Sequence, residues 1–167
     1  MIFVTVGTQL PFDRLVLTVD AWAAAHPTVE CFAQIGAAAT PPKHVPFVPF
    51  VPAEEFDALV RRASLIVAHA GMGSVLTALR FEKPILIMPR HAAAKEHRDD
   101  HQLATARWLQ ERLGVRIAWT SEELQAQLDA RESIPAAPGI TPRATGPLID
   151  RLRSFLFAAP AGGARRT

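Results

Sequence analysis

The chain has 167 residues, of which 49% are hydrophobic and 20% are charged, so it is long enough for one domain with a substantial core. Its formal net charge of +2 does not predict the basic surface with which proteins bind nucleic acid. Its single cysteine excludes an internal disulfide framework and a cysteine-rich zinc module, which favours an intracellular protein. No apolar run reaches the ~20 residues of a membrane span, and we expect no signal peptide, because no basic region precedes the first apolar run.

The first part of the chain alternates apolar runs of strand length with segments of helical periodicity. We expect strands over 2–6 and 29–35, each followed by a glycine, and a helix over 11–26. The prolines of 41–52 predict a loop with at most a short edge strand, because proline cannot donate to a strand ladder. A proline-rich ligand segment is the less favoured alternative for this stretch.

The second part continues the same alternation. In order, we expect a helix over 54–63, a strand over 65–68, a helix over 73–83, a strand over 85–88, a polar loop over 90–100, a helix over 101–113, a strand over 115–119, a helix over 121–130, a surface connection over 133–142 and a helix over 148–156. We expect one domain over 1–157 and a disordered tail over 158–167.

Strands that are apolar throughout and alternate with helices predict an α/β fold with a doubly wound, Rossmann-like parallel sheet. Ligands of such sheets bind beyond the carboxyl ends of the strands, near the point where the strand order reverses. Three loops therefore become candidates for a functional site: 7–9, 69–74 and 90–102.

The second of these loops has the sequence His69-Ala70-Gly71-Met72-Gly73-Ser74. Its glycines would let a ligand approach the backbone, and the free N–H groups of the helix start, with the Ser74 hydroxyl, would form an anion site. We therefore predict diphosphate binding here; the alternative is a tight turn with Ser74 as the helix N-cap. The loop lacks the lysine of a P-loop, the third small residue of a dinucleotide fingerprint and the frame of a nucleophile elbow.

The polar loop before the long helix admits two interpretations. His97 and His101 are four residues apart and would share one face of a helix, where Asp100 could add an oxygen ligand for a metal. Loop and helix meet within this segment, however, so we favour a loop that faces a polar ligand. In that interpretation Asp99 or Asp100 caps the helix, and Gln102 is presented in its first turn.

The remaining candidates have simpler interpretations. Gly7-Thr8, directly after the first strand, forms either an ordinary turn or part of the same cleft. Cys31 lies among apolar residues of a strand, so we expect a buried, unreactive thiol. The tryptophans fall on helix and strand positions, so we expect them in the core: Trp22, Trp108 and Trp119.

Four segments stand out by their order and spacing: Val4-Thr5-Val6-Gly7-Thr8, the loop His69 to Ser74, Lys83-Pro84 with Pro89-Arg90 around a strand, and Asp100-His101-Gln102-Leu103 with Ala106. Together they resemble the C-terminal domain of family-28 glycosyltransferases over residues 1–115. The resemblance is strongest to stand-alone versions of that domain. One is the small catalytic subunit of the eukaryotic enzyme that adds the second GlcNAc to dolichol-diphosphate-GlcNAc, and the other is the small subunit of bacterial exopolysaccharide glycosyltransferases.

The resemblance implies the C-terminal half of a GT-B enzyme, which binds a UDP-sugar donor. It implies that Gly71, Gly73 and Ser74 hold the diphosphate at the helix start. It also implies that Gly7, Thr8 and His69 line the cleft. We find no convincing catalytic base in the chain, and His69 is a weak candidate.

For the sugar and nucleotide, the resemblance implies contacts from Asp100, His101 and Gln102. Many relatives have a glutamate for the ribose where this chain has Thr77, so a ribose contact here would be weaker. The resemblance also implies no resident metal and no cofactor, because the helix dipole and donor groups stabilise the diphosphate and the UDP-sugar is a substrate.

We therefore expect the donor-binding catalytic subunit of a two-chain transferase that moves a sugar from a UDP-sugar to a lipid-linked saccharide in exopolysaccharide biosynthesis. A membrane-anchored acceptor-side subunit would complete it and would hold this cytoplasmic chain at the membrane periphery. The mean hydropathy of +0.13 fits apolar surface reserved for such a partner. The alternatives are a non-catalytic nucleotide-sugar-binding or scaffold subunit, and a metal-dependent hydrolase that uses His97 and His101.

Overall fold

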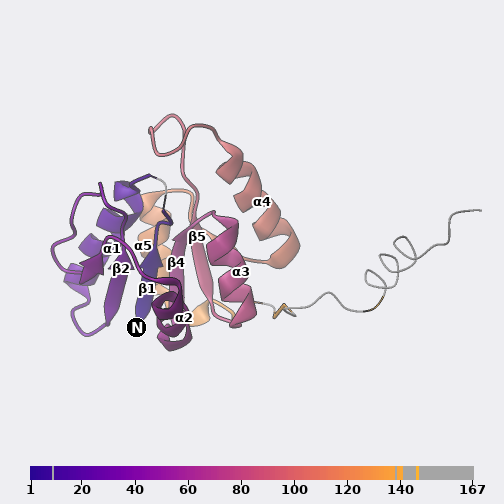
Figure 1. The fold of residues 1–167 in the computed structure, drawn as a ribbon, viewed down its shortest axis with the longest axis horizontal. Coiled ribbons are helices and arrows are strands. Elements are labelled where there is room, and N and C mark those ends of the chain that lie inside the picture. The colour runs from indigo at the N-terminus through magenta and orange to yellow at the C-terminus, as the bar shows by residue number, and fades with distance from the viewer. Residues whose placement is uncertain (9, 138, 141–145, 147–167) are drawn as a thin grey trace, which may run out of the picture.

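The computed structural model describes residues 1–8, 10–137, 139–140 and 146 (Figure 1). Its elements in chain order are β1 (Ile2–Thr5), α1 (Asp13–Ala25), β2 (Cys31–Gln34), β3 (Phe47–Val48), α2 (Ala53–Arg62), β4 (Leu65–His69), α3 (Met72–Arg80), β5 (Ile85–Met88), α4 (His101–Leu113), β6 (Arg116–Ile117), α5 (Ser121–Asp129) and the 3-10 turn η1 (Arg131–Ser133). The strands form one sheet in the order β3-β2-β1-β4-β5-β6.

All neighbouring strands of this sheet run parallel. The register places Ile2 of β1 opposite Cys31 of β2 on one side and opposite Leu65 of β4 on the other. Every residue of β1 and β5 is buried, as expected for strands that helices cover on both faces. The expected doubly wound α/β fold is confirmed.

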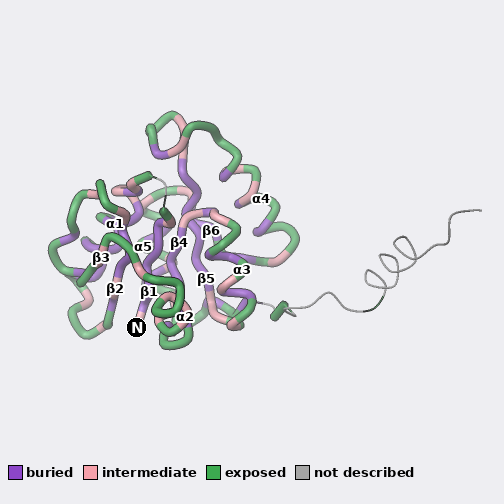
Figure 2. Tube along the Cα trace, in the orientation of Figure 1, coloured by how far each residue is buried: buried purple, intermediate pink, exposed green. Residues whose placement is uncertain are grey.

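The helices form two layers around the sheet. Residues of α1 and α5 pack with one face of the strands, and residues of α2, α3 and α4 pack with the other. Figure 2 shows the buried strands at the centre of these layers, with exposed residues on the outer sides of the helices. Cys31 is buried in the first of the two clusters, and burial raises the pKa of its thiol, which fits the expected unreactive cysteine.

The strand order reverses beside β1. The chain runs outward from β1 to β2 and β3, then crosses back so that β4 pairs with the other side of β1. Loops that leave the carboxyl ends of β1 and β4 therefore diverge toward opposite faces of the sheet and open a crevice between them. The loop 90–100 projects beyond the same end of the sheet (Figure 1).

The helices and strands expected between residues 1 and 130 are present, with boundaries that differ from the structure by a few residues. Gly114 ends α4 in the left-handed conformation, with φ +63°, as its position after the long helix indicates. Trp22 is buried and Trp119 packs against the core, but the expectation for Trp108 is wrong, because half of its surface is exposed on α4. Ser74 does not cap α3, because the helix begins earlier and Gly71 is the N-cap.

The connection after α5 lies at the surface, as expected, but two of its side chains reach the core. Ile134 and Ala137 are 7% and 8% exposed, and they pack on opposite faces of the sheet. The other described residues of this connection are exposed. The expected helix over 148–156, the domain boundary at 157 and the tail over 158–167 lie outside the described residues. No helix within the described residues has the length and apolar character needed to cross a membrane.

Candidate functional site

A cleft of about 950 Å³ lies at the carboxyl ends of β1 and β4. It is lined by residues from the loops after β1 and β4, from the first turns of α3 and α4, from the segment after β3, and from the loop 90–100. This is where the reversal of strand order predicts a ligand site in a doubly wound sheet. We call it the cleft below.

Nine of the ten residues proposed from the sequence line this cleft: Gly7, Thr8, His69, Gly71, Gly73, Ser74, Thr77, His101 and Gln102. The tenth, Asp100, is not among the lining residues. Its Oδ1 accepts a hydrogen bond from the N–H of Ala92 at 2.8 Å, so its carboxylate holds the loop 90–100 together. The structure thus brings three separate loops to one place, and which of their residues touch a ligand stays a prediction.

The start of α3 presents backbone rather than side chains to the cleft. Gly71 is the N-cap, with φ −90° and ψ 131°, and no side chain caps the helix. A Cβ placed on Gly73 would meet no atom within 4 Å, so this glycine faces open space. The first N–H groups of a helix have no partner inside the helix, which leaves donors and a partial positive charge at this edge of the cleft.

His69 lies between two glycines. A Cβ on Gly7 would lie 2.8 Å from Cε1 of His69, and a Cβ on Gly71 would lie 2.1 Å from its Nε2. The ring therefore occupies the space that side chains at these two positions would need. Burial, and secondarily the charge of Arg90, lowers the pKa of His69 to about 4, so its imidazole is neutral at pH 7. Its Nδ1 is buried without a hydrogen-bond partner among the described residues.

The turn after β1 is fixed by a buried glutamine. Gly7 has φ +74°, a conformation that side chains rarely adopt. Its carbonyl accepts a hydrogen bond from Nε2 of Gln34 at 2.9 Å, and the same nitrogen donates to the carbonyl of Pro49 at 3.0 Å. The Oε1 of Gln34 accepts from the Thr5 hydroxyl at 2.8 Å. The hydrogen bonds of Gln34 thereby connect the ends of β1, β2 and β3.

Arg90 is the most important residue of the site that the sequence did not single out as a candidate. Only 2% of it is exposed, and its guanidinium donates to four carbonyls, those of Val6, Leu10, Pro11 and Glu96, at 2.6–3.1 Å. Burial lowers its pKa to about 10, which leaves it charged at pH 7. Arg90 therefore joins the loop after β1 to the loop after β5.

An ion pair supports this arrangement. Nε of Arg14 on α1 lies 2.7 Å from Oε1 of Glu96, whose other oxygen accepts from the N–H of His91 at 2.9 Å. Arg14 also donates to the carbonyl of Pro89 at 2.9 Å. The polar loop 90–100 is thus attached to α1 by charged, largely buried contacts, and a sequence pattern gives no indication of that pairing.

Two predicted ligand contacts already have partners in the fold. Gln102 is 4% exposed, and its Oε1 accepts from the N–H of Arg90 at 3.2 Å. The Thr77 hydroxyl donates to the carbonyl of Gly73, one turn earlier in α3, at 2.8 Å. Gln102 therefore supports the loop after β5 from inside, in addition to lining the cleft.

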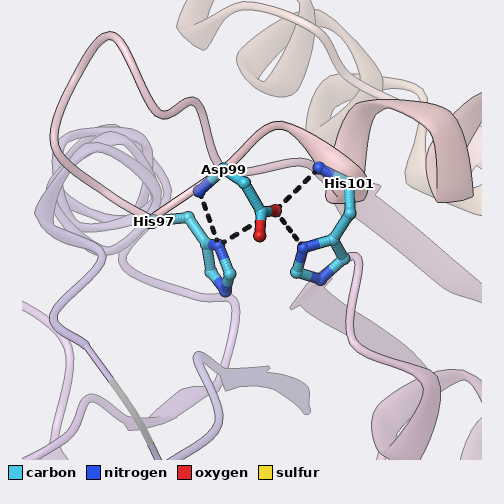
Figure 3. A group of neighbouring side chains, drawn as sticks. All are labelled: His97, Asp99 and His101. Carbon is cyan, nitrogen blue, oxygen red and sulfur yellow. Dashed lines mark hydrogen bonds and ion pairs between the residues drawn. The ribbon is translucent and has the colours of Figure 1, made fainter.

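His97, Asp99 and His101 all line the cleft and lie together, with the Asp99 carboxylate between the two rings (Figure 3). Nδ1 of His97 lies 3.6 Å from Oδ1 of Asp99, and the ring centroids of the histidines are 4.5 Å apart. Oδ1 of Asp99 accepts hydrogen bonds from the N–H and the Nδ1 of His101. The backbone N–H and then the ring of His101 hold the pKa of Asp99 below its ordinary value.

This geometry corrects the sequence analysis in two ways. The histidines are close although His97 lies in the loop before α4 and only His101 lies on the helix. The carboxylate between them belongs to Asp99, whereas Asp100 turns toward Ala92. Asp100 occupies the N-cap position of α4 but makes no side-chain cap, and Asp99 reaches the first helical N–H in its place.

Four apolar residues contribute to the lining of the cleft. They are Leu10, Phe50, Val51 and Phe56, of which Phe50 is 52% exposed and Leu10 is 37% exposed.

Comparisons with known proteins agree with this geometry. The profile of the "Glycosyltransferase family 28 C-terminal domain" matches residues 1–139. The crystal structure of the glycotransferase of kitacinnamycin superposes with a TM-score of 0.57 at 22% identity, over 78% of this chain and 34% of that one. The NMR structure of ALG13 superposes with a TM-score of 0.56 at 21% identity, over 90% of this chain and 93% of that one. No curated protein matches the sequence significantly.

These comparisons differ in how much of the other protein they cover. The chain spans about a third of the kitacinnamycin enzyme and nearly all of the ALG13 structure. At these identities the superpositions show a shared fold, and the profile match shows the family.

Proposed function

Because the chain belongs to the family of glycosyltransferase family 28 C-terminal domains, we propose that it is the donor-binding catalytic subunit of a two-chain glycosyltransferase. It binds a UDP-sugar in the cleft, and a second polypeptide supplies the acceptor side. The observation that carries this proposal is the start of α3, which lines the cleft with a glycine that faces open space.

The diphosphate of the donor binds at the start of α3. Gly73 leaves room for phosphate oxygens next to the backbone, and Ser74 lies beside it in the first turn. The N–H groups of this turn donate to the phosphates, and the helix dipole favours their negative charge. His69 contributes by position, because its neutral ring fixes the two glycine turns on either side of it.

The nucleoside and the sugar occupy the rest of the cleft. Thr77 lies one turn beyond Gly73, so its hydroxyl oxygen is placed for a ribose contact, although its proton is used by the Gly73 carbonyl. The sugar lies toward Thr8, His101 and Gln102. Asp100 acts on this side through the shape of the loop 90–100.

The reaction is a direct displacement. The acceptor hydroxyl gives its proton to a base and attacks the anomeric carbon, while the bond from that carbon to the phosphate oxygen breaks and UDP leaves. The start of α3 stabilises the charge that develops on the departing diphosphate. A pKa of about 4 makes His69 a poor base at pH 7, so we place the base on the acceptor-side subunit.

The partner is a membrane-anchored acceptor-side subunit, and the acceptor is a lipid-linked saccharide of exopolysaccharide biosynthesis. Leu10 and Phe50, which line the cleft, expose apolar surface. A subunit seated there would cover this surface and bring the acceptor to the donor. The chain would then act in the cytoplasm, held at the membrane by its partner.

Titration calorimetry of the isolated chain with UDP tests donor binding. We expect saturable binding of one UDP, and we expect Gly73→Val to abolish it by filling the open space. Ala104→Val is the matched control, since it adds a similar volume at an exposed position of α4 outside the cleft. Absence of saturable heat at millimolar UDP in a folded chain would contradict the proposal.

A transfer assay tests the division into two chains. Membranes that contain the acceptor are incubated with a panel of labelled UDP-sugars, with and without the purified chain. Transfer of label to lipid should require both membranes and chain, and the sugar that is transferred identifies the donor. Transfer by the chain to a soluble acceptor without membranes would contradict the need for a partner.

A non-catalytic nucleotide-sugar-binding or scaffold subunit is the second candidate. It is favoured by Thr77, whose hydroxyl already donates within α3. In that case Gly73→Val would leave the transfer rate of the reconstituted enzyme unchanged, whereas a catalytic subunit would lose transfer together with UDP binding.

A further inference from the structure

We propose that His97, Asp99 and His101 form a binding site for a divalent transition metal of the zinc class. One ligand atom from each of the three residues lies within 4.8 Å of the others. The site lines the cleft but shares no residue with the start of α3. Of the residues proposed to contact the donor, it includes only His101, on the side of the sugar, so it is separate from the proposed diphosphate site.

The spacing of the ligand atoms suits a small metal ion. Two ligands of a tetrahedral zinc, each ~2.1 Å from the metal, lie about 3.4 Å apart. Nδ1 of His97 and Oδ1 of Asp99 are 3.6 Å apart, and Nδ1 of His101 approaches the same oxygen. A small rotation of the exposed Asp99 carboxylate would give all three atoms metal-ligand distances, and three protein ligands leave one position of a tetrahedral metal open.

The hydrogen bonds of the cluster indicate which ring nitrogens are free to bind a metal. Nδ1 of His97 accepts a hydrogen bond from the N–H of Asp99 at 3.3 Å, so this nitrogen carries a lone pair, as a metal ligand must. The His101 ring holds its Nδ1 against the carboxylate, and a metal would take the place of the proton between them. The side chain of His97 is only 12% exposed, so the position of that ring is fixed by its surroundings.

The chemistry of the ligands selects the metal. Two imidazoles and one carboxylate favour Zn²⁺ or Co²⁺ over Mg²⁺ and Ca²⁺, which prefer oxygen ligands. The loop that carries the cluster is held to α1 through Arg14 and Glu96, so the three residues stay together without a metal. This assignment departs from the sequence analysis, in which a metal site was the less favoured interpretation and Asp100 was its oxygen ligand.

The test uses the full chain without a purification tag, after treatment with a chelator and dialysis. Zn²⁺ is added in a calorimeter, Co²⁺ is followed by its visible absorption, and Mg²⁺ serves as the comparison. We expect one Zn²⁺ per chain, a Co²⁺ spectrum of tetrahedral type, and no saturable binding of Mg²⁺. Each of His97→Ala, Asp99→Asn and His101→Ala should weaken Zn²⁺ binding by roughly tenfold or more, which is ~1.4 kcal/mol per ligand.

Two control variants decide whether the site is the one proposed. Asp100→Asn removes the neighbouring carboxylate, and His44→Ala removes an exposed histidine outside the cluster; both should leave Zn²⁺ affinity unchanged. Far-UV circular dichroism confirms that each variant is folded. A second readout needs no variant, because paramagnetic Co²⁺ should broaden the NMR signals of residues 97–101 first. Absence of saturable Zn²⁺ binding, equal effects of Asp99→Asn and Asp100→Asn, or broadening centred elsewhere would overturn the proposal.

Discussion

The imidazole of His69 occupies the space in which Gly71 would carry a side chain. An added Cβ on Gly71 would lie 2.1 Å from Nε2 of the ring, far closer than van der Waals contact allows. Gly73, two residues further on, has no such neighbour. The two glycines of this loop therefore differ: Gly71 makes room for a side chain of the protein, whereas Gly73 faces the open space in which we propose that the diphosphate binds.

Gly71→Ala should destabilise the fold by displacing the His69 ring. We expect a loss of about 1–3 kcal/mol in the free energy of unfolding, as for other overpacked sites. In a His69→Ala background the same substitution should cost less than about 1 kcal/mol, because the ring is gone. Urea denaturation of the four proteins of this double-mutant cycle measures the coupling. Equal losses in both backgrounds would show that the ring does not set the space at Gly71.

Gly73→Ala should separate ligand binding from stability. The added methyl group meets no atom of the protein, and alanine is a better helix former than glycine, so stability should stay the same or rise by up to about 1 kcal/mol. UDP affinity should fall by roughly tenfold, since the methyl group occupies the space proposed for phosphate. Thermal unfolding and UDP calorimetry on the same preparation measure both quantities. Unchanged UDP affinity would remove the start of α3 from the proposed donor site.

Arg90→Met should weaken the connection between the loop after β1 and the loop after β5. The substitution leaves four carbonyls without their donor, so we expect a loss of at least about 2 kcal/mol in unfolding free energy. Arg98→Met is the control: Arg98 also lines the cleft but is exposed, so its change should stay within about 0.5 kcal/mol. Similar denaturation midpoints for the two variants would contradict a structural role for Arg90.

Stability should depend on pH through His69. Its pKa is lowered to about 4 in the fold, against 6.5 in the unfolded chain, so the unfolded state binds the proton more readily between these values. The stability that the neutral His69 ring contributes is complete at pH values above 6.5, its pKa in the unfolded chain, and it is lost as the pH falls toward 4. From pH 7.5 to pH 5 the chain should lose about 2 kcal/mol more than a His69→Gln variant does. Parallel losses in the two proteins would show that His69 titrates normally in the fold.

The elements and their order could be predicted from the sequence because each depends on local pattern. The run Ile85–Met88 is apolar throughout and follows a proline, so a strand is evident there. Gly114 marks the end of α4 by its position alone. The loops of the cleft followed from the rule for parallel sheets. These predictions needed no knowledge of which side chains meet.

The features that could not be predicted from the sequence depend on contacts between distant parts of the chain. Nothing local distinguishes Arg90 from an exposed arginine, and only its place beneath the loops after β1 and β5 gives it four acceptors. The choice of Asp99 over Asp100 depends on the direction in which the loop turns before α4. Trp108 was expected in the core, but the face of α4 that packs inward carries Ala106 and Leu109. Ile134 is buried because the chain after α5 passes the core, which its neighbouring prolines do not indicate.

The central claim is that this cleft binds the UDP part of a sugar donor, and an NMR titration of the labelled chain with UDP tests it most directly. The account predicts saturable shifts of the backbone amide signals of Gly7, Gly73, Ser74 and their neighbours in the cleft, with little change on α1 and α5, which pack on the other face of the sheet. No saturable shift at millimolar UDP, or shifts centred away from the start of α3, would contradict it.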